Sequence, residues 1–208
     1  MQRRTVAREL ALLMLGQVND RQPAADTSLD TLLQQALVSL SQHVREALDQ
    51  AASDLQAAQQ QLLDSELQDQ GALEQLPRVR QHLQDGLEHA EQGLNRLSAS
   101  LELPRLLMLA DQEEIRRGAI DRARAVLAGR DDLDQRLDAV MEGWRLTRLP
   151  RIDRDILRLA AVDIEQFRTP SAVACNEAVE LANRYSDEQG RRMINGVLRR
   201  FTSAPAQS

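Results

Sequence analysis

The fold is decided by residues 152–201, which read IDRDILRLAAVDIEQFRTPSAVACNEAVELANRYSDEQGRRMINGVLRRF. Apolar residues recur there three and four positions apart, the spacing of amphipathic helices. The stretch is interrupted at Thr169-Pro170, because a residue before proline avoids the helical region. It is interrupted again at Ser186-Asp-Glu-Gln189, which matches a capping box led by the Ser186 hydroxyl. The stretch therefore predicts three helices, the first over 153–167, the second over 173–185 and the third ending near Phe201.

The last of these helices contains Asn195-Gly196, a pair that would indicate a hairpin if the flanking pattern were that of strands. Because the flanking pattern is helical, we expect Gly196 to let another helix approach closely. The outer surface of the same helix is predicted to be basic, since it carries Arg191, Arg192, Arg199 and Arg200.

The composition favours helices along the whole chain. Apolar residues make up 42% of the 208 residues and aromatic residues only 2%, so leucine and alanine must form the core. The single cysteine, Cys175, suits a reducing cytoplasm. No apolar run approaches the ~20 residues of a membrane helix, and the short run Leu10–Gly16 lacks a nearby cleavage site for a signal peptide. We expect an all-α cytoplasmic protein without a membrane span.

Residues 3–18 predict a helix that is apolar on almost every side after Val6 and should be buried. Its amino end carries Arg3, Arg4 and Arg8, where the helix dipole disfavours each cation by ~0.3–1 kcal/mol. Two interpretations stay open: a solvated helix terminus, or an anion site that accepts this electrostatic cost because it binds phosphate.

Residues 27–103 predict an acidic helical hairpin. After a loop at 20–27, apolar positions from Leu29 to Leu62 follow an eleven-residue period, and the pattern breaks at Gly71. A second helix then presents one apolar face, formed by Leu83, Leu87, Ala90, Leu94, Leu97 and Leu101. We expect these two faces to pair in antiparallel fashion. The segment has four arginines and twelve acidic residues, a formal charge of −8.

The remainder is expected to restart at Pro104 and to form helices over 115–127 and 133–146, with Trp144, the only tryptophan, in the core. The predicted division is thus a helical domain made of residues 1–26 and 104–208, into which the hairpin of residues 27–103 is inserted.

No pattern indicates catalysis. The chain has no lysine, which excludes Schiff-base chemistry and a P-loop. All three histidines lie within 27–103, so Cys175 and the serines lack an evident base. His82, Asp85 and His89 share a helical face, but solvated side chains explain them better than a metal site does. The residues alone predict a non-enzymatic binding protein without cofactor or metal.

Several motifs resemble those of the NusB family, which are bacterial transcription antitermination factors. They are RRTVARELA at 3–11, WRLTRL at 144–149, IDRDILR at 152–158, NEAVELA at 176–182 and INGVL at 194–198. The resemblance covers about 1–26 and 104–208, and the acidic segment between them has no counterpart in the usual family pattern.

The resemblance implies an all-α fold of two packed helical sub-bundles. It also implies binding to boxA RNA of ribosomal RNA transcripts, together with a ribosomal small-subunit protein (NusE), in an antitermination complex on elongating RNA polymerase. Arg3, Arg4 and Arg8 match the family's RNA-contacting amino end, and arginine suits phosphate contacts and base stacking.

The resemblance places Asp153, Glu188 and Gln189 on the surface that binds the ribosomal partner. Two positions depart from the family pattern. Gln189 replaces an acidic residue of this surface, and Gly16 replaces an aromatic residue that could stack on a base. Asp153 keeps the other acidic position of this surface, so partner binding is still expected, without the acidic group at Gln189.

Two alternative functions stay open. The chain could be a non-catalytic RNA-binding accessory module of a ribosomal RNA cytosine methyltransferase, because similar domains occur fused to such enzymes. It could also be a protein-interaction scaffold built on the acidic hairpin.

Overall fold

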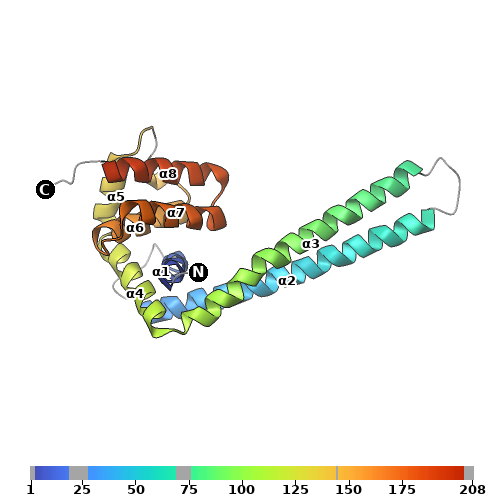
Figure 1. The fold of residues 1–208 in the computed structure, drawn as a ribbon, viewed down its shortest axis with the longest axis horizontal. Coiled ribbons are helices and arrows are strands. Elements are labelled where there is room, and N and C mark those ends of the chain that lie inside the picture. Colours follow the sequence, from blue (N-terminus) through green and yellow to red (C-terminus); the bar gives the residue numbers. More distant parts are fainter. Residues whose placement is uncertain (1–2, 19–27, 69–75, 144, 204–208) are drawn as a thin grey trace. The chain divides into compact units, whose positions relative to one another are not determined.

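The computed structural model describes residues 3–18, 28–68, 76–143 and 145–203, and covers the backbone alone at 65–68, 76, 78, 96 and 98–107. Trp144, the loop at 20–27 and the break at Gly71 lie outside the described residues. Throughout the described part, all regular structure is helical, which confirms the all-α prediction (Figure 1). Within that part, no helix has both the length and the apolarity of a membrane span.

The structure contains eight α-helices and one 3-10 turn within the described residues. In order, they are α1 (Arg3–Gly16), α2 (Leu29–Gln68), α3 (Leu76–Ala110), α4 (Glu113–Ala128), α5 (Arg130–Ala139), the 3-10 turn η3 (Leu146–Arg148), α6 (Arg151–Glu165), α7 (Ser171–Tyr185) and α8 (Glu188–Ser203).

The contacts divide the chain into two compact units. The first comprises Met1–Leu37 and Leu109–Ser208, and the second comprises Val38–Met108. The sequence-based division places the boundaries at 27 and 103 instead, and the assignment of separate functions to the two parts remains a prediction.

In the first unit, α1 and α6 form the centre of the core. Helix α1 packs chiefly on α4 and also on α6, and α6 further contacts α5, α7 and α8. In Figure 1, α1 is seen nearly end-on, whereas α7 and α8 run across the view. The α1 side chains Val6, Leu10 and Leu12 are fully buried, as expected for a helix that is apolar on nearly every side.

Two predicted helix boundaries in this half are wrong. Helix α3 continues through Pro104 to Ala110. A proline inside a helix loses one amide hydrogen bond and crowds the preceding turn, and here the flanking residues that favour helix offset this cost. The helix expected over 133–146 ends at Ala139. Gly143 then adopts a φ of 75°, and the Leu146 amide donates to Asp138 Oδ1 at 2.6 Å.

Two predictions about α8 are also wrong. Asp187, not Ser186, caps the helix, since Asp187 Oδ1 accepts the Gly190 amide at 2.7 Å. The helix begins one residue later than the predicted capping box requires, and the Ser186 hydroxyl instead donates to Asp153. Gly196 allows no close helix approach, because a Cβ at this position would meet nothing within 4 Å.

The second unit pairs α2 with α3 in antiparallel fashion, but through small residues. The Ala51 carbonyl lies 3.2 Å from where a Cβ on Gly93 would be, and the Ala58 carbonyl lies 3.3 Å from the same point on Gly86. The expected leucine seam on α3 is wrong, because Leu87 is 71% exposed. Glycines let the two backbones approach too closely for leucine side chains to fit between them.

Candidate nucleic-acid interface

A cleft of about 250 Å³ lies at the amino end of α1. Its lining comprises Arg3, Arg4, Ala7, Glu114, Gly118, Arg122, Phe167 and Thr169. The three arginines come from two helices, α1 and α4, which are packed together. The cleft therefore combines positive charge with one aromatic ring.

The two arginines at the start of α1 are exposed but differ in their pairing. Arg3 donates to Glu114 at 2.5 Å, and both side chains are about two-thirds exposed or more, at 68% and 71%. Such an ion pair is worth ~0–1 kcal/mol and is easily exchanged for another anion. Among the described residues, no hydrogen bond or ion pair engages Arg4. Arg4 is therefore available to an incoming phosphate.

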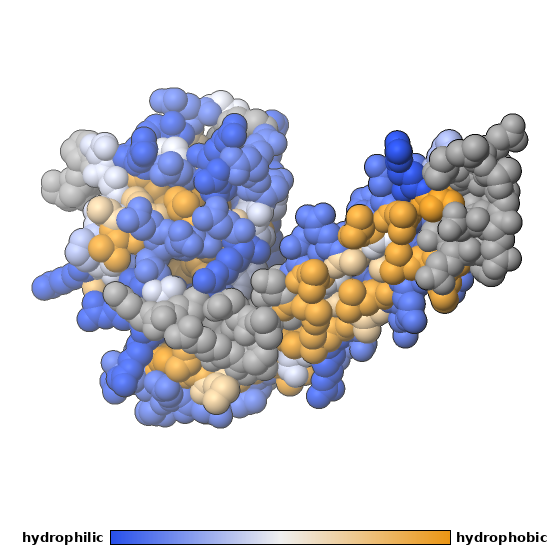
Figure 2. Space-filling model, turned by 45° about the vertical axis from the view of Figure 1, so that its right-hand side comes forward, coloured by the Kyte–Doolittle hydropathy of each residue, from blue (hydrophilic) through white to orange (hydrophobic). Residues whose placement is uncertain are grey.

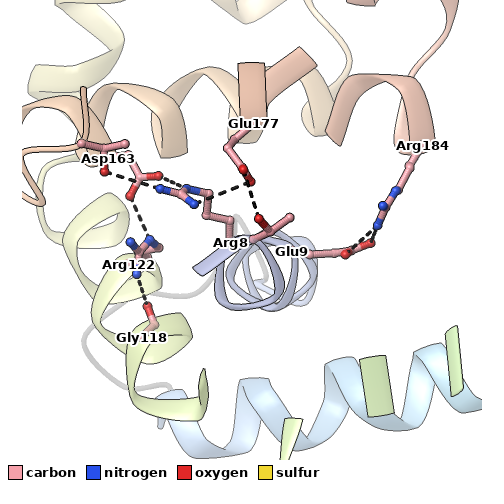
Figure 3. Close-up of polar contacts among 9 residues, drawn as sticks. Arg8, Glu9, Gly118, Arg122, Asp163, Glu177 and Arg184 are labelled. Carbon is pink, nitrogen blue, oxygen red and sulfur yellow. Dashed lines mark hydrogen bonds and ion pairs between the residues drawn. The ribbon is translucent and has the colours of Figure 1, made fainter. Parts of the chain in front are cut away.

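Arg8 lies inside the protein, with a side chain only 4% exposed. Its Nε donates to Asp163 Oδ2, and its Nη1 lies 3.6 Å from Glu177 Oε2. The third predicted arginine is thus placed beneath the surface and is held by α6 and α7 (Figure 3). Its burial and pairing argue against a direct contact with a phosphate.

Arg122 shares the same carboxylate and forms the inner wall of the cleft. Its Nε donates to Asp163 Oδ1 at 2.8 Å, and its Nη1 donates to the Gly118 carbonyl at 3.0 Å. The guanidinium carbon stands 4.4 Å from the centre of the Phe167 ring, a cation–π arrangement. Burial lowers the pKa of Arg122.

Glu9 fixes the orientation of α1 against α7. It is 2% exposed, and it accepts hydrogen bonds at 2.8 Å from Arg184 and from the Tyr185 hydroxyl. Burial, followed by the charge of Glu9, raises the pKa of Tyr185. Figure 3 shows the contact between Arg184 and Glu9 beside the Arg8–Asp163–Arg122 group. The contacts of Glu9 and those of Arg8 together fix the rotation of α1 about its axis.

The residues of the predicted partner surface come from the starts of α6 and α8, which lie next to each other. Asp153 is 2% exposed, and its carboxylate oxygens lie 2.9 and 3.1 Å from where a Cβ on Gly190 would be. Burial raises the pKa of Asp153, and the charge of Asp187 raises it further. The Asp153 side chain therefore lies buried beneath the turn between α7 and α8 and is not exposed on its surface.

Glu188 and Gln189 lie exposed in the first turn of α8. Glu188 accepts from Arg191 Nε and from Arg192 Nε, both at 2.9 Å, and these hydrogen bonds lower its pKa. The basic outer surface expected on α8 is thus partly neutralised at its start.

Arg122 and Phe167 were not identified as site residues from the sequence. A signal was present for Arg122, which falls on the apolar face of α4 among Ala119, Ala123 and Val126. Asp163 likewise falls within the apolar pattern of α6. Opposite charges on two buried faces indicate an internal ion pair. Nothing in the sequence indicates that Phe167 reaches the cleft.

Among the described residues, no group of three or more His, Cys, Asp or Glu side chains is arranged to hold a metal ion. The His82 ring instead hydrogen-bonds to Gln61 through Nδ1 at 2.7 Å. The fold and the cleft together define an all-α protein with an arginine-lined cleft at the start of a buried helix.

Comparison with known proteins gives the family. The model of the NusB family matches residues 72–203. Transcription antitermination protein NusB from a Synechococcus strain is 45% identical over 204 residues, covering 98% of this chain and 94% of that protein. The protein of the same name from Gloeothece citriformis is 41% identical and covers 97% and 93%. The chain therefore belongs to the NusB family.

A solved structure of NusB from T. maritima is 28% identical, with a TM-score of 0.44, over 50% of this chain and 77% of that one. The curated relatives are named as transcription antitermination proteins and not as enzymes, which agrees with the expectation of a non-enzymatic protein. Their alignments cover 97–98% of this chain, so they include residues 27–103. These relatives therefore have a sequence counterpart of residues 27–103.

Proposed function

We propose that this protein is a transcription antitermination factor that binds the boxA element of ribosomal RNA transcripts at the amino end of α1. It does so together with a ribosomal small-subunit protein (NusE), and the pair joins an antitermination complex on elongating RNA polymerase. The observation that carries this proposal is the cleft in which the exposed Arg4, which pairs with no other described residue, lies beside Arg3, Arg122 and Phe167.

Within the cleft, we assign the phosphate contacts to Arg3 and Arg4. A guanidinium can bind a phosphate with two parallel hydrogen bonds, and Arg3 can exchange its exposed partner Glu114 for one. Arg8 and Arg122 are already bound to Asp163, so their role is to hold the floor and wall of the cleft in place. RNA sequence is read mainly from unpaired bases, and Phe167 supplies an aromatic ring at the site.

For the ribosomal partner, we assign the contacts to the exposed turn that carries Glu188 and Gln189. Asp153 acts indirectly, by holding the turn through Ser186 and Gly190. The charge left at Glu188 is shared with Arg191 and Arg192, so a partner must provide cations that replace these two arginines, or neutral donors to Gln189.

The RNA assignment is tested by titrating a fluorescent boxA RNA with the full chain at several salt concentrations. The double variant Arg3→Ala with Arg4→Ala removes two phosphate contacts. Binding should weaken about tenfold or more at low salt. The negative slope of log affinity against log salt should become shallower by about 1.4. Adding the ribosomal partner should tighten RNA binding by the wild type.

Arg117→Ala is the matched control, because Arg117 lies on α4, is 80% exposed and does not line the cleft. It should leave both the affinity and the slope close to those of the wild type. The control removes one arginine and the double variant removes two, so a control loss half as large in log affinity would show that only net charge matters. An unchanged double variant would refute the assignment of the RNA site.

A further inference from the structure

The second unit has an exposed apolar stripe, which we call the leucine stripe. It consists of Leu48, Leu55 and Leu62 on α2 and Leu83, Leu87 and Leu94 on α3, with exposed fractions from 40% to 71%. In Figure 2, apolar residues gather in a band along the two helices of the hairpin.

The leucine stripe is exposed because of the way in which α2 and α3 pack on each other. Gly86 and Gly93 face the backbone of α2, so the helices meet through small residues and the leucines are displaced to one flank. There, a Cβ on Gly93 would lie 3.2 Å from the side chain of Leu55. The leucines thus border the seam without being covered by it.

The spacing of the stripe is that of a helix-packing surface. On α2, the leucines recur every seven residues, and on α3 they follow steps of four and seven. A seven-residue repeat keeps one apolar face toward a neighbouring helix over its whole length. The two helices of the hairpin meet mainly through small residues, at Gly86 and Gly93, so most of the leucine surface on the flank is left for another pair of helices.

Most acidic residues of the hairpin lie away from the stripe. Asp64 follows Leu62 by two positions and Asp85 follows Leu83 by two, which turns each carboxylate about 200° around its helix. Glu91 stands at the outer edge of the stripe, one turn beyond Leu87. A similar surface can therefore face the stripe without bringing many carboxylates together.

We propose that the leucine stripe is the docking surface for a second copy of this chain, with two hairpins forming a four-helix bundle about a two-fold axis. The exposed parts of the six leucines amount to several hundred Å², the range in which apolar patches mark interaction sites. Two such surfaces and their margins would bury an area close to the ~1,200–2,000 Å² of a stable interface. The proposal does not depend on RNA binding.

Sedimentation equilibrium of the full chain, up to about 100 µM, tests the proposal in the range of a weak interface. The wild type should dimerise. The variant Leu87→Gln with Leu94→Gln should raise the dimer Kd about a hundredfold or more, because each leucine loses the free energy of apolar burial. Both positions are more than half exposed, at 71% and 61%, so the helix content measured by circular dichroism should be retained.

Leu63→Gln is the matched control. Leu63 is 47% exposed but is turned about 100° from Leu62, off the stripe. It should dimerise like the wild type. Raising the salt should preserve or strengthen the dimer, since salt screens the repulsion between acidic hairpins. A dimer that dissociates with salt would overturn the apolar interface.

Cross-linking locates the contact. In a Cys175→Ser background, Leu87→Cys should give a dimer with a bis-maleimide linker, and Gln60→Cys should not. A wild type that is monomeric at the highest concentration would overturn the proposal, and so would a dimer that survives the double leucine variant.

Discussion

Asp163→Asn is the substitution that should most reduce the stability of the first unit. The carboxylate accepts one hydrogen bond from Arg8 and one from Arg122, and all three residues are at most 6% exposed. An asparagine keeps one acceptor oxygen and turns an amide donor toward the other guanidinium. It also removes the negative charge that the two buried cations share.

The size of the stability loss depends on the partners that Arg8 and Arg122 keep after the substitution. Arg8 keeps Glu177, at 3.6 Å, and Arg122 keeps the Gly118 carbonyl. Neither replaces a buried carboxylate, and breaking a buried ion pair by removing one partner costs ~3–5 kcal/mol. Because solvent screens these groups little, we expect a loss in this range, which corresponds to a shift of the urea midpoint on the order of 1–2 M.

Urea unfolding followed by fluorescence measures the effect, since the single tryptophan belongs to the sequence of the first unit. Glu114→Gln is the control. It breaks an ion pair whose side chains are 68% and 71% exposed and should cost at most ~1 kcal/mol. Adding Arg122→Met to Asp163→Asn should recover part of the loss, because it removes an unpaired buried cation. A loss no larger than that of the control would refute the reasoning.

Further predictions concern the start and middle of α8. Gly190→Ala should destabilise the protein by ~1–3 kcal/mol, because the added Cβ would lie 2.2 Å from Ser186 Oγ. Gly196→Ala should stabilise it by ~1 kcal/mol, because the added Cβ meets open space; a loss of thermal stability at Gly196 would contradict this. Burial raises the folded-state pKa of Asp153 above its unfolded value, which is about 3.9. The folded state therefore binds the proton more readily, so the wild type should gain stability relative to Asp153→Asn as the pH falls from 7 toward 4 and lose it again as the pH rises. Parallel pH profiles of the two proteins would rule out this titration.

The sequence was sufficient for features that depend on local pattern. Helix type along 152–201 follows from the spacing of apolar residues, which reports on the helix that contains them. The break at Thr169-Pro170 is equally local, and α7 begins at Ser171. The family motifs were also readable because they are short and contiguous, and the family assignment is confirmed.

Local patterns gave wrong predictions where one helix has two faces that could each be buried. On α3, the leucine face has the stronger apolar pattern, yet the glycine face packs on α2, because a close backbone approach excludes large side chains. The same limit applies to the capping box, where Ser186 and Asp187 were both able to cap and the contact with Asp153 selected between them.

By itself, then, the sequence determined the all-helical fold class, the position of most helices, the family and the cluster of arginines at the start of the chain. Only the tertiary structure decided which of those arginines face solvent. Arg8 and Asp163 are 155 residues apart, and their contact depends on how α1 packs between α4 and α6. Charge is a property of each residue, whereas exposure is a property of the packing around it. For this reason, Arg4 is available to a phosphate and Arg8 is not.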